Sequence, residues 1–329
     1  MELNQPWWID TIKAVVIANV VLVAFAYMTW LERKLLGRMH LRYGPNRVGP
    51  FGLLQPIADL VKLIRKESFV PTAAVDVLFV LAPAFAGFTA IAAFSVIPFG
   101  GVWHWGRYDV TGNVVDVSIA VVLIFALGAI GVYAFLVGGW ASDSKFSLLG
   151  SMRTAAQLVS YEVSLALAVL GVVIMGQSLS LTEIVAKQQE TIWFAGPQFV
   201  ALLVFLVAGT AETSRAPFDL PEADTELVAG YATEYGGMRW GLFAQAEYIN
   251  MITLSGLAVT LFFGGWGGPG LPGPVWFVLK LLAVIFVFMW MKATLPRLRY
   301  DQLMKLGWKV LLPVATVNAV VTAVLVVAL

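Results

Sequence analysis

The chain has 329 residues, of which 60% are hydrophobic and 12% are charged, and its formal net charge is +1. Because soluble domains usually carry about 25% charged residues, this composition indicates a protein that lies in a membrane. The small net charge argues against nucleic acid as a partner. The lack of Cys excludes a thiolate-bound iron–sulfur cluster or a disulfide framework in this chain.

Apolar runs long enough to cross a hydrocarbon core of about 30 Å as helices recur along the whole chain. We predict eight transmembrane helices in an all-α fold. The runs cover residues 8–31, 75–98, 114–139, 157–177, 197–214, 238–264, 275–295 and 308–329. The first run is full length and has no small-residue cleavage site after a short core, so we expect it to remain as a span. Without internal repeats or low-complexity segments, a single integral membrane domain over residues 1–329 is the simplest organisation.

Lys and Arg are distributed unevenly between the two sets of loops. The first loop alone contains Arg33, Lys34, Arg38, Arg42, Arg47, Lys62, Arg65 and Lys66. The side opposite the odd-numbered loops has only Lys13, Arg107 and Lys187. Because short basic loops stay on the cytoplasmic side, we predict that the odd-numbered loops face the cytoplasm and that both termini lie on the outer side.

Within the first loop, residues 50–66 have the pattern of an amphipathic helix lying in the membrane interface. The apolar positions at helical spacing are Leu53, Ile57, Leu60, Val61 and Ile64, and the polar positions are Gln55, Asp59, Lys62 and Lys66. The polar side has two interpretations. It is either the solvated side of a surface helix or the border of an opening for an amphiphilic molecule.

Two carboxylic acids stand out inside predicted spans. An ionisable group at the centre of a span costs about 2.5–3.5 kcal/mol, so it needs a partner, a wet cavity or a function. Glu162 lies near the start of the fourth run, and Glu247 lies nine residues into the sixth. Both are candidates for passing protons; the alternative is a protonated structural acid that is hydrogen-bonded to a neighbouring helix.

The fifth loop is acidic on a side that is otherwise basic. Between Gly209 and Gly241 it has six acids against Arg215 and Arg239. The acids are Glu212, Asp219, Glu222, Asp224, Glu226 and Glu234. Acids two residues apart do not share a helical stripe, so we expect an irregular segment that presents several carboxyls to one cavity. A solvated acidic loop that docks a basic partner is the alternative.

The seventh loop places Arg297, Arg299, Tyr300 and Asp301 directly after a span. This group is either a positive-inside anchor or a docking surface for soluble subunits. The only histidines, His40 and His104, are too few and too far apart to indicate a metal site. No glycine-rich dinucleotide or phosphate-binding motif is present in the sequence.

Several motifs in this order resemble one family, the H-type membrane subunit (chain 1) of respiratory complex I, the proton-pumping NADH:quinone oxidoreductase. They are Glu32-Arg33-Lys34, the run from Gly44 through Gln55 to Lys62, Ser160-Tyr161-Glu162, residues 212–226, Glu234-Tyr235, Ala246-Glu247-Tyr248 and the run from Pro296 to Gln302. The resemblance extends over essentially the whole chain. Asp224 stands where the family usually has Glu, and Lys292 where Arg is common, which puts only their individual contacts in doubt.

The resemblance implies a chamber through which ubiquinone or menaquinone reaches an iron–sulfur cluster in a neighbouring subunit. The first span, the interfacial helix and the sixth span would frame its opening. The implied quinone-lining residues are Arg33, Arg42, Gln55, Asp59 and Lys62. The implied carboxylate path contains Glu162, Glu212 and Glu247, and the acidic loop leading to it contains Asp219, Glu222, Asp224, Glu226 and Glu234.

By the same resemblance, this chain binds no redox cofactor of its own, and partner subunits handle NADH, FMN and the iron–sulfur clusters. Expected partners are two peripheral subunits over the cytoplasmic face, small and antiporter-like membrane subunits, and lipid. Docking would involve Arg297, Arg299, Tyr300 and Asp301. We expect a bacterial inner-membrane location and no activity of the chain alone. Three alternatives are the equivalent subunit of a membrane-bound hydrogenase, an independent transporter and a passive scaffold.

Overall fold

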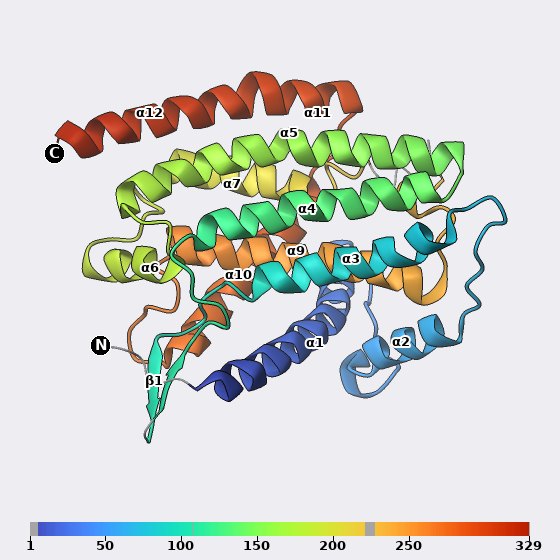
Figure 1. The fold of residues 1–329 in the computed structure, drawn as a ribbon, viewed down its shortest axis with the longest axis horizontal. Helices are drawn as coiled ribbons and strands as arrows, with labels where there is room; N and C mark the ends of the chain where they lie inside the picture. Colours follow the sequence, from blue (N-terminus) through green and yellow to red (C-terminus); the bar gives the residue numbers. More distant parts are fainter. Residues whose placement is uncertain (1–5, 107, 221–227, 329) are drawn as a thin grey trace.

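The computed structural model describes residues 6–106, 108–220 and 228–328. Most of its helices run along the long axis of the molecule (Figure 1). They are α1 (Trp7–Met39), α2 (Gln55–Arg65), α3 (Asp76–Phe94), α4 (Ala120–Ala141), α5 (Lys145–Gly176), α6 (Leu181–Glu190), α7 (Phe199–Glu212), α9 (Gly237–Phe262), α10 (Gly273–Thr294), α11 (Tyr300–Leu306) and α12 (Leu312–Ala328). Short turns of other helix types are η1 (Pro50–Gly52), η2 (Gly230–Ala232) and η3 (Gly307–Leu311).

In the described part of the chain, six helical segments are long and apolar enough to cross a membrane. They are α1, α3, α4, α5, α10 and the continuous segment Tyr300–Ala328. Of the two remaining predicted runs, α7 is apolar but has 14 residues, and α9 has 26 residues and includes Glu247 and Asn250. The chain is therefore a mainly helical, multi-pass membrane protein, and the count of eight spans stays a prediction.

Pro and Gly mark several helix boundaries. Pro56 lies in the first turn of α2 and Pro274 in the first turn of α10, where a missing backbone N–H costs nothing. α9 begins at Gly237, whose φ of 58° is in the left-handed region. These breaks separate runs that are otherwise apolar enough to continue as helix.

One part of the fold departs from the all-α prediction. The strands β1 (Val102–Trp105) and β2 (Tyr108–Thr111) form an antiparallel hairpin between α3 and α4, with Val102 opposite Thr111. The turn includes Gly106, with φ of 64°. Aromatic and β-branched residues favour strands, but four-residue strands inside a loop give too short an alternating pattern to be distinguished from irregular structure. The helix α6 between the fourth and fifth runs was likewise not predicted.

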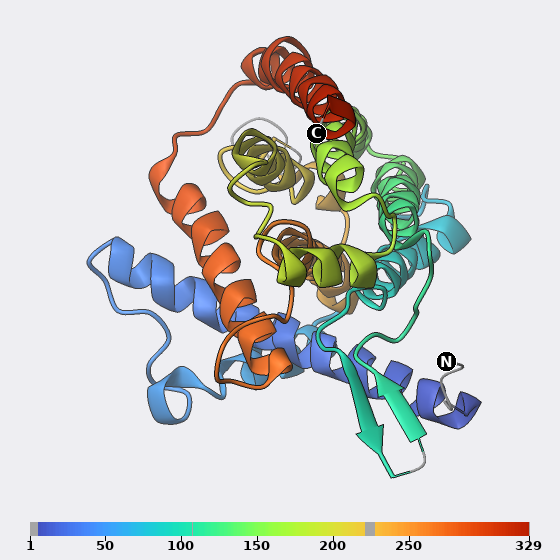
Figure 2. The same cartoon turned by 90° about the vertical axis from the view of Figure 1, so that its left-hand side faces the viewer.

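Helix α9 lies at the centre of the bundle (Figure 2). From Met251 to Phe262 every residue is buried, with other helices around it. Its first half is mixed, because Arg239, Glu247 and Asn250 alternate there with buried apolar residues. The core of the protein therefore continues at one end of α9 into a polar region.

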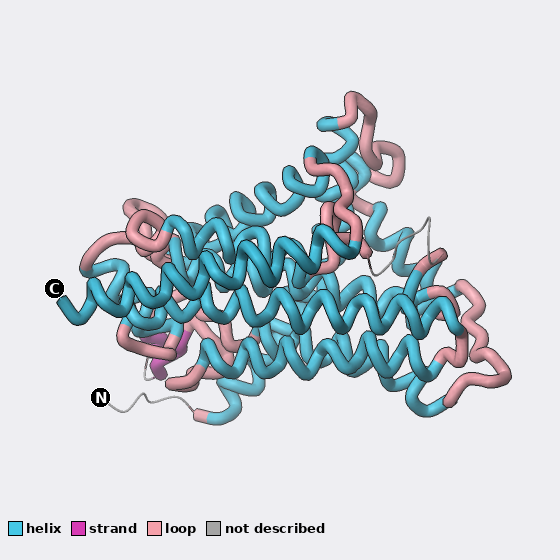
Figure 3. The backbone as a smooth tube through the Cα atoms, turned by 90° about the horizontal axis from the view of Figure 1, so that it is seen from above, coloured by secondary structure: helices cyan, strands magenta, loops and turns pink. Residues whose placement is uncertain are grey.

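Loops collect at the two ends of the bundle (Figure 3). The first turn of α1 and the last turn of α12 lie at the same end, together with the hairpin (Figure 1). Helix α2 and the connection between α4 and α5 lie at the other end. The last residues of the fifth loop lie beside the end of α2, since a Cβ at Gly236 would come within 3.7 Å of the Glu67 carbonyl, so this part of the loop belongs to the same end as the basic first loop.

Helix α1 is only loosely attached to the rest of the bundle. It has 33 residues, but only Ile9, Val21, Met28, Glu32 and Gly37 are buried. Much of its remaining surface is exposed and apolar. In a membrane this surface contacts lipid or other membrane helices.

The segment expected to form an interfacial helix is helical over Gln55–Arg65, inside the predicted range of 50–66. Ile57, Leu60 and Ile64 are among its exposed apolar side chains. Exposed apolar residues along one helix suit a lipid surface. The location of α2 in the membrane interface stays a prediction.

Lys280 of α10 fixes the connection that follows α9. Its ammonium group donates to the backbone carbonyls of Phe263 (2.7 Å), Gly265 (3.0 Å) and Gly267 (2.6 Å), and lies 4.6 Å from the ring centre of Trp193. The Phe263 carbonyl caps the C-terminal end of α9, where a cation is favourable, and the other two carbonyls belong to the loop directly after it.

We predict that Lys280→Met destabilises the protein by about 2 kcal/mol, because three carbonyls lose a charged donor. The measurement is the midpoint of thermal unfolding of the purified complex. Lys305→Met is the matched control, since Lys305 is exposed and its ion pair with Asp301 is 4.0 Å long. Equal midpoints for the two variants would contradict the anchoring role of Lys280.

Candidate functional site

A buried ion cluster connects three segments that are far apart in the sequence. Glu32 of α1 accepts a hydrogen bond from Lys292 Nζ of α10 at 2.6 Å on one oxygen. Its other oxygen accepts a short hydrogen bond from Arg215 Nη1, in the loop after α7. The Arg215 guanidinium also lies 4.0 Å from the ring centre of Tyr248 in α9. We name Glu32, Arg215 and Lys292 the Glu32 cluster.

The cluster carries one negative and two positive charges. The side chains of Glu32 and Arg215 are 6% and 8% exposed. Burial alone lowers the pKa of Arg215, but the Glu32 carboxylate more than offsets this and raises that pKa above its usual value, so Arg215 stays charged. Its Nε has no hydrogen-bond partner among the described residues. The cluster is therefore a buried, net positive site that favours a polar or anionic group.

Three of the predicted quinone-lining residues lie together. Arg33 Nη1 is 2.6 Å from Asp59 Oδ2, and Gln55 Nε2 donates to Asp59 Oδ1 at 3.0 Å. These contacts join α1 to α2. Arg33 directly follows Glu32 in the sequence, so this junction is next to the Glu32 cluster on α1. Arg42 and Lys62 are exposed, and neither forms an ion pair with another described residue. The structure thus joins Arg33, Gln55 and Asp59 through hydrogen bonds and an ion pair, and no such contact joins Arg42 or Lys62 to them among the described residues.

The three carboxyls predicted to form a path share two small cavities. Glu162 and Glu212 line a cavity of ≈ 50 Å³ between α4, α5, α7 and α9. Glu212 and Glu247 line a second cavity of ≈ 20 Å³. Glu212 therefore belongs to both, between Glu162 on one side and Glu247 on the other.

Glu247 is also held from the side of the fifth loop. Tyr231 of η2 donates its hydroxyl to Glu247 Oε1 at 2.6 Å. The Tyr231 ring packs edge-on against Phe135 and Phe243, with ring centres 5.1 and 5.2 Å apart. An aromatic pocket thus fixes the hydroxyl that orients this carboxyl.

The described part of the acidic loop is attached to the bundle near Glu212. Buried Gln157 donates to the carbonyls of Ala211 at 2.8 Å and Phe218 at 2.9 Å. Asp219 and Glu234 are both partly buried. The predicted site residues Glu222, Asp224 and Glu226 lie outside the described residues.

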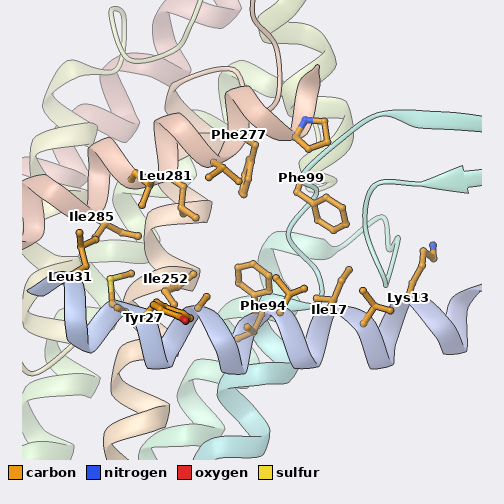
Figure 4. A pocket seen from close by; sticks show the side chains of 18 of the residues that line it. Lys13, Ile17, Tyr27, Leu31, Phe94, Phe99, Ile252, Phe277, Leu281 and Ile285 are labelled. Carbon is orange, nitrogen blue, oxygen red and sulfur yellow. The ribbon is translucent and has the colours of Figure 1, made fainter. Parts of the chain in front are cut away.

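A large apolar cavity lies along α1 (Figure 4). Its volume is ≈ 700 Å³. Side chains of α1, α9, α10 and the hairpin region line it, including Tyr27, Leu31, Ile252, Leu281 and Ile285, and Lys13 lies at one end. Its lining includes none of the five predicted quinone-lining residues and no residue of α2. Leu31 directly precedes Glu32, so the cavity extends to the level of the Glu32 cluster.

The predicted docking residues lie at the start of α11 and are largely exposed. Arg299 Nη2 is 3.2 Å from Asp301 Oδ2. Tyr300 is 38% exposed, and Arg297 is also exposed. The backbone N–H of Leu298 donates to the carbonyl of Pro217 at 3.1 Å. This surface therefore adjoins the acidic loop.

Comparison with known proteins identifies the family. A family model described as NADH dehydrogenase matches residues 12–323. The chain belongs to the NADH dehydrogenase family. Within that family, the second H-type subunit of the NADH-quinone oxidoreductase of Syntrophobacter fumaroxidans is 52% identical over 311 residues, covering 94% of this chain and 93% of that protein.

Two further members of the NADH dehydrogenase family are similarly close. The second H-type NADH-quinone oxidoreductase subunit of Geobacter sulfurreducens is 54% identical, covering 94% of both chains. The H-type subunit from Thermomicrobium roseum is 50% identical, covering 92% of both. The resemblance to the H-type subunits of complex I, drawn from sequence motifs, is confirmed.

The sequence interpretation missed most of the Glu32 cluster. In the sequence, Glu32 is part of a motif, Arg215 is a counter-charge in the acidic loop and Lys292 is a departure from the family pattern. The first span continues as helix to Met39, so Glu32 belongs to it and not to the loop. Recognising that extension would have identified Glu32 as a further acid inside a span.

We predict that Glu32→Gln destabilises the assembled protein by about 3–5 kcal/mol, because Arg215 stays buried without a carboxylate partner. Thermal unfolding of the purified complex measures the loss. Glu190→Gln is the control, since Glu190 is exposed at the end of α6 and an exposed charge is worth at most about 1 kcal/mol. A Glu32→Gln variant as stable as the Glu190→Gln variant would show that the cluster does not hold the segments together.

Proposed function

We propose that this chain is the membrane subunit of a proton-pumping NADH:quinone oxidoreductase that lines the quinone passage and links quinone reduction to proton movement. The observation that carries the proposal is the arrangement of Glu162, Glu212 and Glu247 along two cavities that share Glu212. The names of the relatives support the choice of the quinone enzyme over the hydrogenase-type alternative.

The Glu32 cluster gives the carboxyls a connection to the quinone. Arg215 belongs to the cluster and also lies within the electrostatic influence of Glu247. Reduction of a quinone to a quinol takes up two electrons, supplied by partner subunits, and two protons. A change of charge next to Arg215 therefore alters how strongly Glu247 holds its proton. The change passes along the cavities to Glu212 and Glu162, and from there to antiporter-like subunits.

The passage for the quinone includes the apolar cavity along α1. Two of the three elements expected to frame the opening, the first and sixth spans, contribute to its lining as α1 and α9. An isoprenoid tail is a long apolar chain, which suits a cavity of ≈ 700 Å³ with apolar walls. The polar head of the quinone would then lie near Arg33, Gln55, Asp59 and the Glu32 cluster, with Arg42 and Lys62 nearer the surface.

The topology follows from the same proposal. Helices α7 and α9 complete eight spans, α2 lies in the interface, and the end with α2 and the acidic loop faces the cytoplasm of a bacterial inner membrane. The surface of Arg297, Arg299, Tyr300 and Asp301 then faces the peripheral subunits that carry NADH, FMN and the iron–sulfur clusters. The chain catalyses nothing alone.

The relay is tested by replacing Glu247 or Glu162 with Gln, which removes the titrating group and keeps its size. We expect quinone-coupled turnover and proton pumping in native membranes to fall by about tenfold or more. NADH oxidation by an artificial acceptor that bypasses the quinone should remain unchanged. Glu190→Gln, at an exposed position of α6, is the control. Full coupled activity in both relay variants, with normal assembly, would exclude the relay.

The passage is tested by Val20→Trp in α1, which narrows the apolar cavity. Val23→Trp is the matched control, because Val23 does not line the cavity and the two valines are similarly exposed, at 57% and 55%. Val20→Trp should raise the KM for long-tailed quinones by about threefold or more and change the KM for short-tailed analogues little. If Val20→Trp changed the KM for long-tailed and short-tailed quinones equally, the quinone tail would not lie in this cavity.

A further inference from the structure

We propose that Gly128 of α4 and Asn250 of α9 form a water site that joins the two cavities of the carboxylate path. The inference rests on the proposed relay function and adds two residues to it. Neither residue is charged, and neither is part of a motif identified in the sequence. Both line the cavity of Glu162 and Glu212 as well as the cavity of Glu212 and Glu247.

The cavities have room for water. A cavity holds one water molecule when the centre of that molecule can occupy about 10–15 Å³. The two cavities have volumes of ≈ 50 and ≈ 20 Å³. Buried water also needs two to four polar partners. Glu212 Oε2 is buried without a hydrogen-bond partner among the described residues. Thr253 adds a polar group in the larger cavity, and Ser214 adds one in the smaller.

Gly128 creates the space at the junction. A Cβ atom added there would meet no atom within 4 Å. Other glycines of α4 differ: a Cβ at Gly138 would approach Phe243 to 2.9 Å, and one at Gly139 would approach Ser151 to 2.4 Å. Those two glycines let neighbouring elements approach closely, whereas Gly128 does not. Because Gly is less favourable than Ala inside a helix, open space at Gly128 calls for another explanation, which water supplies.

Asn250 provides hydrogen bonds without a charge. It lies three residues after Glu247, which places it about one helical turn along the same side of α9. Its amide group has both donors and an acceptor, and no hydrogen bond connects it to another described side chain. An amide at the junction can therefore orient water toward Glu212 without titrating itself.

Water at this site completes proton transfer between the carboxyls. One carboxylic acid donates its proton to a water molecule, and the same molecule gives a proton to the next carboxylate. No water is consumed, and one proton leaves Glu247 for each that reaches Glu212. Gly128 and Asn250 are thus positioning residues, which act through the water they admit and hold.

Gly128→Ala tests the requirement for space. In native membranes with the complete complex, we expect quinone-coupled turnover to fall by about threefold or more and the solvent isotope effect of that turnover to rise, because proton transfer becomes slower. The artificial-acceptor reaction and the thermal midpoint should not fall, since Ala favours the helix and meets no neighbour. Gly87→Ala in α3 is the matched control: its Cβ would lie 3.6 Å from Gln245, an ordinary contact, and it lines neither cavity.

Asn250→Leu tests the requirement for the amide. The variant keeps the branching of the side chain, occupies more space and removes the hydrogen bonds of the amide, so we expect the same loss of coupled turnover and the same rise in isotope effect. Asn250→Ser retains a donor and acceptor and should recover most of the activity.

The relay and the water site can fail separately. If Glu247→Gln and Glu162→Gln lower coupled turnover while Gly128→Ala and Asn250→Leu leave turnover and isotope effect unchanged, the relay stands and the water site is wrong. If the two Gln variants also have full activity, the relay itself is wrong. A loss in Gly128→Ala accompanied by a lower thermal midpoint and an unchanged isotope effect would mean a packing role, and would also overturn the water site.

Discussion

The shared carboxylate of Glu32 is the interaction on which the arrangement of the functional end depends. A buried charge is tolerated only with partners, and Glu32 finds them in Arg215 and Lys292, which come from the loop after α7 and from α10. Helix α1 buries few residues of its own. Its attachment at this end therefore relies on the cluster, and so does the position of the first part of the acidic loop. Tyr248, packed against Arg215, extends the same connection to the central helix.

The two halves of α9 differ, and the half that contains Tyr248, the contact of Arg215, is the one with polar groups. The half after Met251 is completely buried and forms the core. The half before it carries Glu247 beside the fifth loop and Asn250 at the junction of the cavities. Groups that exchange protons must stay within hydrogen-bonding range of each other or of a common water molecule, and side chains on packed helices keep their positions better than side chains on loops. The proposed relay groups Glu162, Glu212 and Glu247 therefore lie on packed helices and not on loops.

The sequence predicted those features that depend on local pattern. The run at 75–98 corresponds to α3 at Asp76–Phe94, and the run at 275–295 to α10 at Gly273–Thr294. Glu162 and Glu247 were identified because a carboxyl in an apolar run is costly in any fold. The Glu32 cluster was not assembled, because its hydrogen bonds join residues 183 and 260 positions apart and no periodicity reports such a contact. Gly128 gave no signal either, since glycine is common in membrane helices, and only the surrounding atoms distinguish open space from close packing.

Passing a proton and passing a quinone make opposite demands on packing. Protons need small cavities with polar groups in their walls, and the region between α4, α5, α7 and α9 has two, of ≈ 50 and ≈ 20 Å³, with carboxyls in both linings. A large apolar molecule needs room, and the loosely packed α1 leaves ≈ 700 Å³ beside α9 and α10. The Glu32 cluster lies between these regions in the sequence, since Glu32 follows Leu31 of the apolar cavity and Arg215 follows Glu212 of the small cavities by three positions. Under the proposed function, a charge that arrives with the quinone would need to cross only this cluster to affect the carboxyls. The protons would then move between packed helices while the apolar tail stays in the cavity along α1.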